Sequence, residues 1–169
     1  MLKEIEFPYL ETFTNFGWDI LLGLRGTYSD LLPKEFYSSL IIKENGTILD
    51  YVRGTSIQLI LDDIAEMFNT TTDGEMPDEE IDLLECSRIV YKNPYLTAPI
   101  LRTTQLGFHE RILQLIIDGN IMSKTGGRSH MAKEELWQMK AIMQGQRPSN
   151  SVIILEQMAE ICTNPRRHL

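Results

Sequence analysis

One segment of this 169-residue chain, residues 39–60, has the pattern of β-strands, and most of the rest has the pattern of helices. The segment is rich in β-branched residues and contains two dipeptides typical of tight turns, Asn45-Gly46 and Arg53-Gly54. These turns predict two strand pairings: 39–43 with 47–51, and 48–52 with 56–60. A chain with a single ribbon lacks the strands for a sandwich or a parallel sheet. The sequence therefore predicts a mainly α fold with one small antiparallel β-ribbon.

Apolar residues recur at helical spacing in the other segments, which predicts a compact domain of about six to seven helices over residues 1–169. The expected helices are residues 9–24, 30–40, 61–69, 78–92, 106–120, 131–144 and 150–162. Trp18 lies near the middle of the first helix, which we expect to be continuous until Gly23. Asp62 is expected to cap the third helix, and Gly119 suits a left-handed cap at the end of the fifth.

Apolar stripes predict which faces of three helices are buried. In the fifth helix the stripe consists of Phe108, Ile112, Leu115 and Ile116. The last two helices, joined through Gly145 and Pro148, are expected to form a helical hairpin over about 131–162. Their stripes are Ala132, Leu136, Trp137, Met139, Ile142 and Met143 in one, and Val152, Leu155, Met158, Ala159 and Cys162 in the other. Such stripes are far more often core than cofactor site, although the methionines also suit an adaptable groove for a partner helix.

Composition indicates a folded intracellular protein. The apolar content of 43% and charged content of 24% are typical of globular domains. No apolar run approaches the length of a membrane span, and the acidic start, MLKEIEFPYLETF, does not resemble a signal peptide. We therefore expect no membrane association, and the sequence leaves open whether the compartment is nuclear or cytoplasmic.

Charge is distributed unevenly along the chain. Residues 1–100 carry 18 acidic and 7 basic side chains, and residues 101–169 carry 6 acidic and 9 basic ones. The acidic part repels phosphate, so nucleic-acid binding would have to use the C-terminal third. The residues of that alternative are Lys124, Arg128, Lys133, Lys140, Arg147, Arg166 and Arg167. The same asymmetry favours head-to-tail contact between copies of the chain.

Residues 69–80 are the best candidate for a metal site. They place Asn69, Thr71 and Asp73 at the first, third and fifth positions of a calcium loop, Gly74 at the sixth and Glu80 at the twelfth. An amide and a hydroxyl stand at two ligand positions that normally hold carboxylates, so the preferred interpretation is a solvated acidic loop. We predict no metal and no cofactor.

Residues able to perform catalysis are scattered along the sequence. His109, His130 and His168 have no second ligand at zinc-site spacing, and Cys86 and Cys162 lack a CxxC partner. Lys124 follows Gly119 without the second glycine that a phosphate-binding loop requires. We therefore predict that the protein is not an enzyme.

Three stretches of the chain together resemble one family. They are TNFGWDILLGLRGTYSDLLPKEFYSSL, YVRGTSIQLILDDIAEMF and HMAKEELWQMKAIMQGQRPSNSVIILEQM. In this order and spacing they are similar to the plant transposon protein domain, a mobile-element domain found in retrotransposon-like loci. The resemblance covers about residues 8–162. One departure is at Ile60 and Leu61, where the family pattern offers a Ser or Thr cap.

The resemblance implies an origin rather than a mechanism, since the family supplies no catalytic residue or cofactor to carry over. A transposase would need a carboxylate triad on a larger sheet, so Asp62, Asp63 and Asp82 are not assigned to one. The leading hypothesis is a non-enzymatic helical domain of a plant retroelement-derived protein that acts through protein–protein contact or self-association. The alternatives are the nucleic-acid-binding module above and a truncated relic without selected activity.

Overall fold

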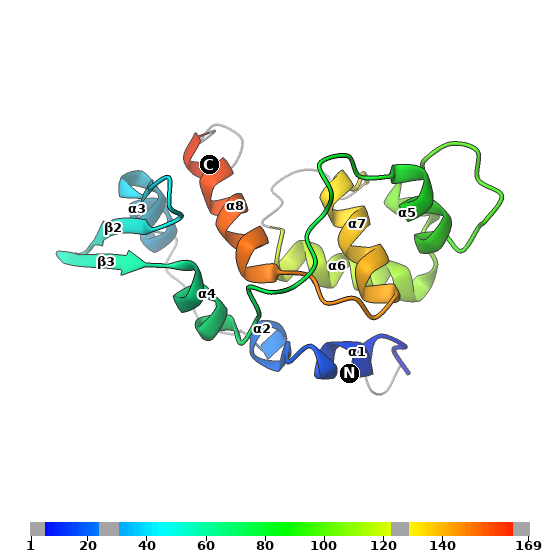
Figure 1. Cartoon of the computed structure of the whole chain (residues 1–169), viewed down its shortest axis with the longest axis horizontal. Coiled ribbons are helices and arrows are strands. Elements are labelled where there is room, and N and C mark those ends of the chain that lie inside the picture. Colours follow the sequence, from blue (N-terminus) through cyan, green and yellow to red (C-terminus); the bar gives the residue numbers. More distant parts are fainter. Residues whose placement is uncertain (1–5, 24–30, 123–128, 164–169) are drawn as a thin grey trace.

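The computed structural model describes residues 6–23, 31–122 and 129–163 of the chain (Figure 1). Within these ranges the fold is mainly α with one three-stranded antiparallel sheet, as predicted. The helices are α1 (Leu10–Asn15), α2 (Asp19–Gly23), α3 (Leu31–Ser39), α4 (Leu61–Phe68), α5 (Leu83–Val90), α6 (Phe108–Asn120), α7 (Lys133–Met143) and α8 (Asn150–Thr163). The strands are β1 (Ile41–Ile42), β2 (Ile48–Val52) and β3 (Thr55–Leu59), and a 3-10 turn covers Thr103–Gln105.

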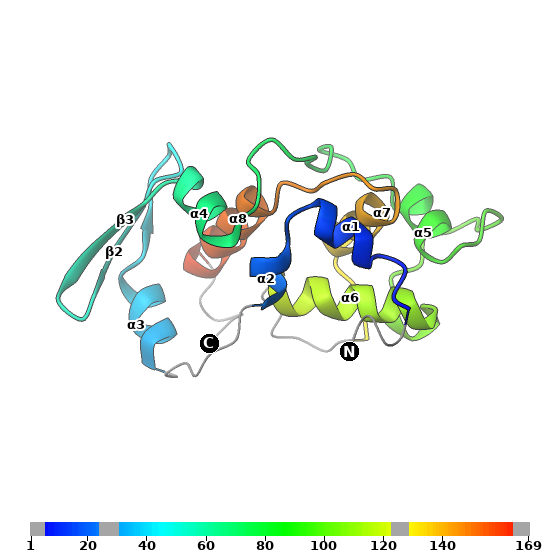
Figure 2. The same ribbon diagram turned by 90° about the horizontal axis from the view of Figure 1, so that it is seen from below.

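The elements lie along an elongated molecule. The sheet and α3 occupy one end and α5 the other (Figure 2). Helix α8 stands between the sheet and the α6–α7 pair (Figure 1). It packs against α4 and α3, whereas α7 packs against α5 and α6. The two helices of the expected C-terminal hairpin over 131–162 therefore have different packing partners.

The ribbon has the predicted turns, but one register differs by a residue. β1 pairs with β2 as expected, with Ile41 opposite Leu49. β2 pairs with β3 so that Val52 lies opposite Thr55, which leaves only Arg53 and Gly54 in the turn. Both turn residues have positive φ, 49° and 80°, as a two-residue hairpin turn requires. The predicted pairing of 48–52 with 56–60 was wrong because it placed a third residue in the turn.

The expected first helix is broken in two at Gly17. Gly17 has a φ of +71°, and its carbonyl accepts a 2.8 Å hydrogen bond from the Asn69 amide. A Cβ at Gly17 would lie 3.0 Å from that amide nitrogen, so the chain turns where only glycine fits without strain. The break lets Trp18 fold back to stack on Phe13, with ring centroids 5.2 Å apart.

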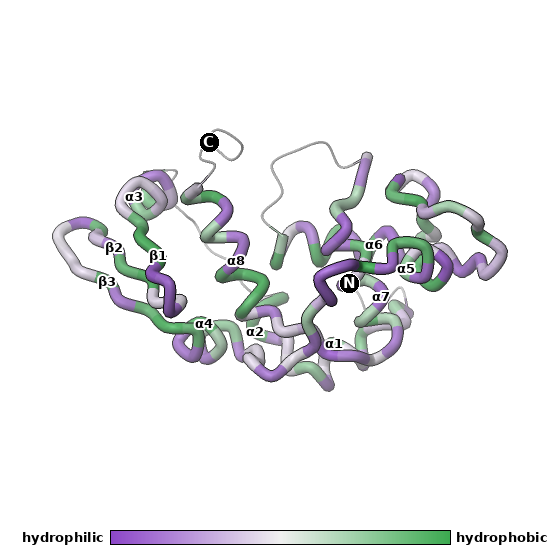
Figure 3. The backbone as a smooth tube through the Cα atoms, turned by 45° about the horizontal axis from the view of Figure 1, so that its top comes forward, coloured by the Kyte–Doolittle hydropathy of each residue, from purple (hydrophilic) through white to green (hydrophobic). Residues whose placement is uncertain are grey.

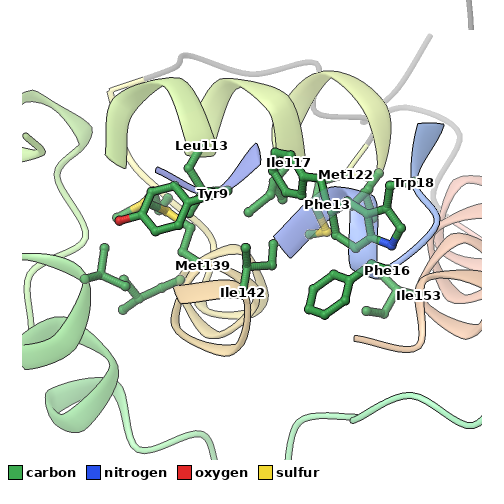
Figure 4. Close-up of a cluster of buried hydrophobic side chains, with 14 of the residues drawn as sticks. Tyr9, Phe13, Phe16, Trp18, Leu113, Ile117, Met122, Met139, Ile142 and Ile153 are labelled. Carbon is green, nitrogen blue, oxygen red and sulfur yellow. The ribbon is translucent and has the colours of Figure 1, made fainter. Parts of the chain in front are cut away.

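A large hydrophobic cluster, called here the main core, joins α1, α2, α5, α6 and α7 (Figure 4). Its buried members are Phe7, Tyr9, Phe13, Phe16, Trp18, Leu21, Cys86, Val90, Leu113, Ile117, Ile121, Met122, Met131, Leu136, Met139, Ile142 and Ile153. A second core lies between the sheet, α3, α4 and α8, and its buried members are Leu40, Ile48 and Ile64. The two cores meet at α8, where Ile154 packs against both.

The buried face of α6 differs from the predicted stripe. Leu113 and Ile117 are buried together with the polar residues Glu110, Gln114 and Asp118, whereas Phe108 and Leu115 are exposed. Glu110 and Gln114 are tolerated there because they are hydrogen-bonded. Glu110 accepts a bond from the Tyr9 hydroxyl, and the Gln114 amide donates to Glu135 of α7 at 2.5 Å. Gly119 lies within α6, and the expected cap at that residue was wrong.

Side-chain hydrogen bonds hold the starts of two further helices, α4 and α8. At the start of α4, the carboxylate of Asp63 accepts a 2.7 Å bond from the backbone N–H of Ile60. The expected cap at Asp62 was therefore wrong, since the carboxylate one residue later makes the bond. At the start of α8, the hydroxyls of Ser149 and Ser151 donate to the carbonyl of Thr71.

Candidate functional site

The second core is incomplete, and an apolar pocket of about 350 Å³ opens beside it. Walls come from α3, β3, α4, the end of α6 and α8. The lining residues are Phe36, Tyr37, Leu59, Ile64, Met67, Phe68, Ile121, Ile154, Gln157, Met158 and Ile161. Its volume is at the lower end of the range for ligand sites, about 300–1,000 Å³. The backbone of α8 and of the β3–α4 junction, which both contribute to the lining, includes hydrophobic stretches (Figure 3).

Helix α8 serves both cores because it is apolar around much of its circumference. Ile153 faces the main core, where it lies near Phe16 (Figure 4). Ile154, Gln157, Met158 and Ile161 recur at i, i+3, i+4 and i+7 and line the pocket. Three members of the predicted stripe, Leu155, Met158 and Cys162, pack against the second core, and all five members are partly buried. The contact of α8 with both cores could have been inferred from the run VIIL at 152–155, because a helix that is apolar on two sides contacts two partners.

Few polar groups reach the pocket, and they are neutral. Burial raises the pKa of the Tyr37 hydroxyl, with a further contribution from the nearby Cys162. Outside the lining, Cys162 packs against the second core, and burial, with Asp50 nearby, raises the pKa of its thiol. Gln157 contributes an uncharged amide. The pocket can therefore bury an apolar group, and nothing in its lining activates a nucleophile.

Residues of the candidate metal loop form hydrogen bonds within the fold. The carbonyl of Thr71 accepts from Ser149 and Ser151, and its hydroxyl accepts a 3.0 Å bond from the N–H of Asp73. Asn69 bonds to Gly17, and Glu80 is exposed. Across the described ranges 6–23, 31–122 and 129–163, no three His, Cys, Asp or Glu side chains are placed to hold a metal ion.

The histidines and cysteines of the described chain lie apart from one another. His109 lies against the rings of Phe7 and Phe108, and His130 borders a shallow hollow beside Arg102. Cys86 is buried in the main core, and burial raises the pKa of its thiol despite the opposing effect of Lys140. His168 lies outside the described residues.

Of the basic residues of the alternative interface, three are described, and two of them lie beside acidic side chains. Lys140 pairs with Glu85 at 3.1 Å, and Lys133 lies 3.7 Å from Glu134. Arg147 is partly buried in the α7–α8 loop, where its carbonyl accepts from the N–H of Glu75. The other four, Lys124, Arg128, Arg166 and Arg167, lie outside the described residues.

Comparisons with protein-family models, with curated proteins and with solved structures find no match to the chain. No described helix is both long enough and apolar enough to cross a membrane. The pocket between α3, α4 and α8 is consequently the strongest feature on which to base a function.

Proposed function

We propose that the chain is a non-enzymatic protein-interaction domain whose binding site is the apolar pocket. The observation that carries the proposal is a hollow of about 350 Å³ whose lining is apolar apart from the Tyr37 hydroxyl and the Gln157 amide. Its walls come from segments distant in sequence, so the hollow exists only in the folded domain. A partner would fill it with apolar side chains from one short segment.

Burial of apolar surface supplies the affinity in this proposal. Each aliphatic or aromatic side chain that moves from water into such a pocket contributes roughly 1.5–3 kcal/mol. A few anchors of this kind dominate the energy of most protein interfaces. Met67 and Met158 supply flexible, polarisable walls that adjust to the shape of an anchor. Met67 is 49% exposed and is therefore accessible to a partner.

The non-enzymatic part of the proposal is supported by the chemistry of the lining. Catalysis of acyl or phosphoryl transfer uses an activated nucleophile, a base near neutrality or a bound metal. Tyr37 and Cys162 have raised pKa values, which keeps both groups protonated. Carboxylates lie outside the lining.

The origin of the domain in a plant retroelement-derived reading frame belongs to the same proposal and rests on the three sequence stretches alone. It has a separate test in the genome. Retroelement terminal repeats or polyprotein remnants flanking the gene would support this origin. Their absence from the locus and from loci of similar genes would oppose it.

Selection from a random peptide library tests the binding function directly. Immobilised wild-type chain should enrich peptides that contain apolar anchors. These peptides should lose binding to Met67→Glu, which places a charge in the pocket wall. They should keep binding to Leu115→Glu, which changes a residue of similar exposure on α6 outside the pocket.

Circular dichroism of both variants checks that the fold is retained. The proposal is overturned if no peptide is enriched, or if the enriched peptides bind wild type and Met67→Glu equally well.

A further inference from the structure

The helices around the pocket carry an excess of negative charge. Among the described residues of α3, α4 and α8, acidic side chains outnumber basic ones by six to one. The acidic residues are Glu35, Asp62, Asp63, Glu66, Glu156 and Glu160, and the basic residue is Lys34. Strand β3 carries no charge. An apolar pocket within such a negative field attracts cations and repels anions.

Helical geometry places part of this charge next to the lining. Asp63 precedes Met67 by one turn of α4, and Glu160 follows Gln157 by three positions on α8. Glu66 lies two residues from both Ile64 and Phe68, so it is on the face of α4 away from the pocket. The carboxylate of Asp63 also accepts the bond from Ile60, which holds its charge in a fixed position. Asp63 and Glu160 therefore flank the apolar lining, and these two residues are called here the acidic rim.

The shape of the lining suits a helix. The four residues that α8 contributes span positions 154–161, which is about 10 Å along the helix axis. Side chains at i and i+4 of a partner helix are about 5–6 Å apart, so two anchors one turn apart fit within this length. Binding of an amphipathic helix in an apolar groove is a common mode of recognition.

We propose that the occupant of the pocket is an amphipathic helix of a partner protein, with two apolar anchors one turn apart and lysine or arginine residues beside them. This inference rests on the proposed function and specifies its partner. The acidic rim selects against two other apolar ligands: a fatty acid brings a carboxylate, and an acidic amphipathic helix brings glutamates. Both place negative charge against negative charge.

Three synthetic peptides test the inference by fluorescence anisotropy. The first is a basic amphipathic helix of leucine and lysine, the second replaces its lysines with glutamates, and the third scrambles the first so that the apolar face is lost. We expect saturable binding of the first, at least about tenfold weaker binding of the other two, and weakening as salt rises to several times physiological strength. A soluble fatty acid should not displace the basic peptide.

A pair of variants with the same change of net charge separates the rim from the overall charge. Glu160→Lys alters the rim, and Glu11→Lys alters an exposed position on α1, next to the main core. Glu160→Lys should weaken the basic peptide about threefold to tenfold, and Glu11→Lys should change it less than about twofold. Equal effects of the two variants would overturn a role for the rim.

The remaining outcomes distinguish this inference from the proposed function. If library selection succeeds but the basic peptide does not bind, the partner is not a basic helix and the pocket function stands. If the scrambled peptide binds as well as the basic one, the attraction is non-specific and the inference fails. If a fatty acid displaces the peptide, or if sedimentation shows a dimer that the peptide dissociates, the occupant is a lipid or a second copy, and the inference is overturned.

Discussion

The main core and the second core use similar residues but differ in how completely they are closed. In the main core, the side chains of Trp18, Leu113 and Met139 are fully buried, with 0% exposure. In the second core Ile48 is equally buried, but the residues packed around it, such as Tyr37 and Met158, remain partly exposed. The main core has seventeen buried members and the second core three, and the pocket opens beside the second core with Ile121 of the main core in its lining.

The difference follows from what covers each core. The main core is enclosed by α1 and α2 on one side and by α5, α6 and α7 on the others, so side chains reach it from several directions. The second core has a three-stranded sheet that α3 covers and that leaves Ile41 and Tyr51 exposed. Full enclosure favours stability, whereas partial enclosure leaves apolar surface available for a ligand. We therefore expect mutations in the two regions to affect different properties.

Two methionine substitutions compare the cores with the same change of side chain. Met139 is fully buried in the main core, and Met158 lines the pocket. Met139→Ala should lower the free energy of unfolding by about 2–5 kcal/mol, because it leaves a cavity that cannot collapse. Met158→Ala should cost less than about 1 kcal/mol, because its side chain is already partly hydrated. Denaturant titration measures both.

The same pair should show the opposite order in binding. Met158→Ala should weaken apolar peptides selected on the wild type, and Met139→Ala should leave their affinity unchanged at temperatures where it is folded. Equal losses of stability would show that the second core is as closed as the main core.

Gly74 tests the joint that fixes α8 between the cores. Its neighbours are backbone atoms, since a Cβ at Gly74 would lie 2.4 Å from the nitrogen of Ser149 and 2.5 Å from the carbonyl carbon of Pro148. Gly74→Ala must separate these segments and should cost about 1–3 kcal/mol. Gly119→Ala on α6 is the matched control: its Cβ would meet nothing within 4 Å, and it should stabilise the helix by up to about 1 kcal/mol. Thermal unfolding that shifts in the same direction for both variants would contradict the close approach at Gly74.

The element types could be predicted from the sequence, and the reasons are local. Turn chemistry at Asn45-Gly46 and Arg53-Gly54 located the ribbon, and apolar periodicity located the helices. The break at Gly17 could not be predicted in this way, because the bond that supports it comes from Asn69, over fifty residues away. Local patterns report local preferences, and a tertiary contact overrode them here.

The buried faces were harder to predict because polar residues lie on them. Gln114 and Glu135 appear solvent-facing by type, but they bond to each other inside the protein. A prediction from apolar residues alone assigns such residues to the surface. The predicted buried face of α6 was therefore displaced around the helix from the observed one. The pocket was missed for a related reason: its walls come from α3, α4 and α8, and no single segment contains it. Only the methionine content indicated an adaptable surface.

Glu110 provides a pH-dependent comparison, because its ionised carboxylate is buried beside the main core. One carboxylate oxygen accepts bonds of 2.8 Å from the Tyr9 hydroxyl and from the Lys92 ammonium. Burial alone would raise the pKa of Glu110, but the bonds from Lys92 and Tyr9 outweigh it and the pKa is lowered from 4.5. A carboxyl whose pKa is lower in the folded state stabilises the fold above its unfolded pKa, and this stability is lost as the pH falls through the folded value.

The wild-type chain should therefore lose stability from this group as the pH falls below 4.5. Glu110→Gln keeps the shape of the side chain but should remove this part of the pH dependence. Urea titrations at a series of pH values measure it. The expected difference is absent if the two chains have parallel stability profiles between neutral and acidic pH.

The smallest expected effect comes from the helix caps, one beside each core. Asp82 caps α5, where its carboxylate accepts bonds of 3.0 and 2.9 Å from the N–H groups of Leu84 and Glu85. Asp82→Ala leaves both donors without this partner and should cost about 1 kcal/mol, or about 2–4 °C in Tm. Asp63 satisfies a single N–H at the start of α4, so Asp63→Ala should cost about half as much.

The two caps should also differ in how far unfolding spreads. Because α5 packs into the main core, loss of its cap should appear as global unfolding. Because α4 borders the open pocket, its loss should appear as faster hydrogen exchange confined to α4 and β3, together with weaker binding of basic peptides. If hydrogen exchange after Asp63→Ala spreads evenly through α6 and α7, the two cores unfold as one unit and the proposed division between them is wrong.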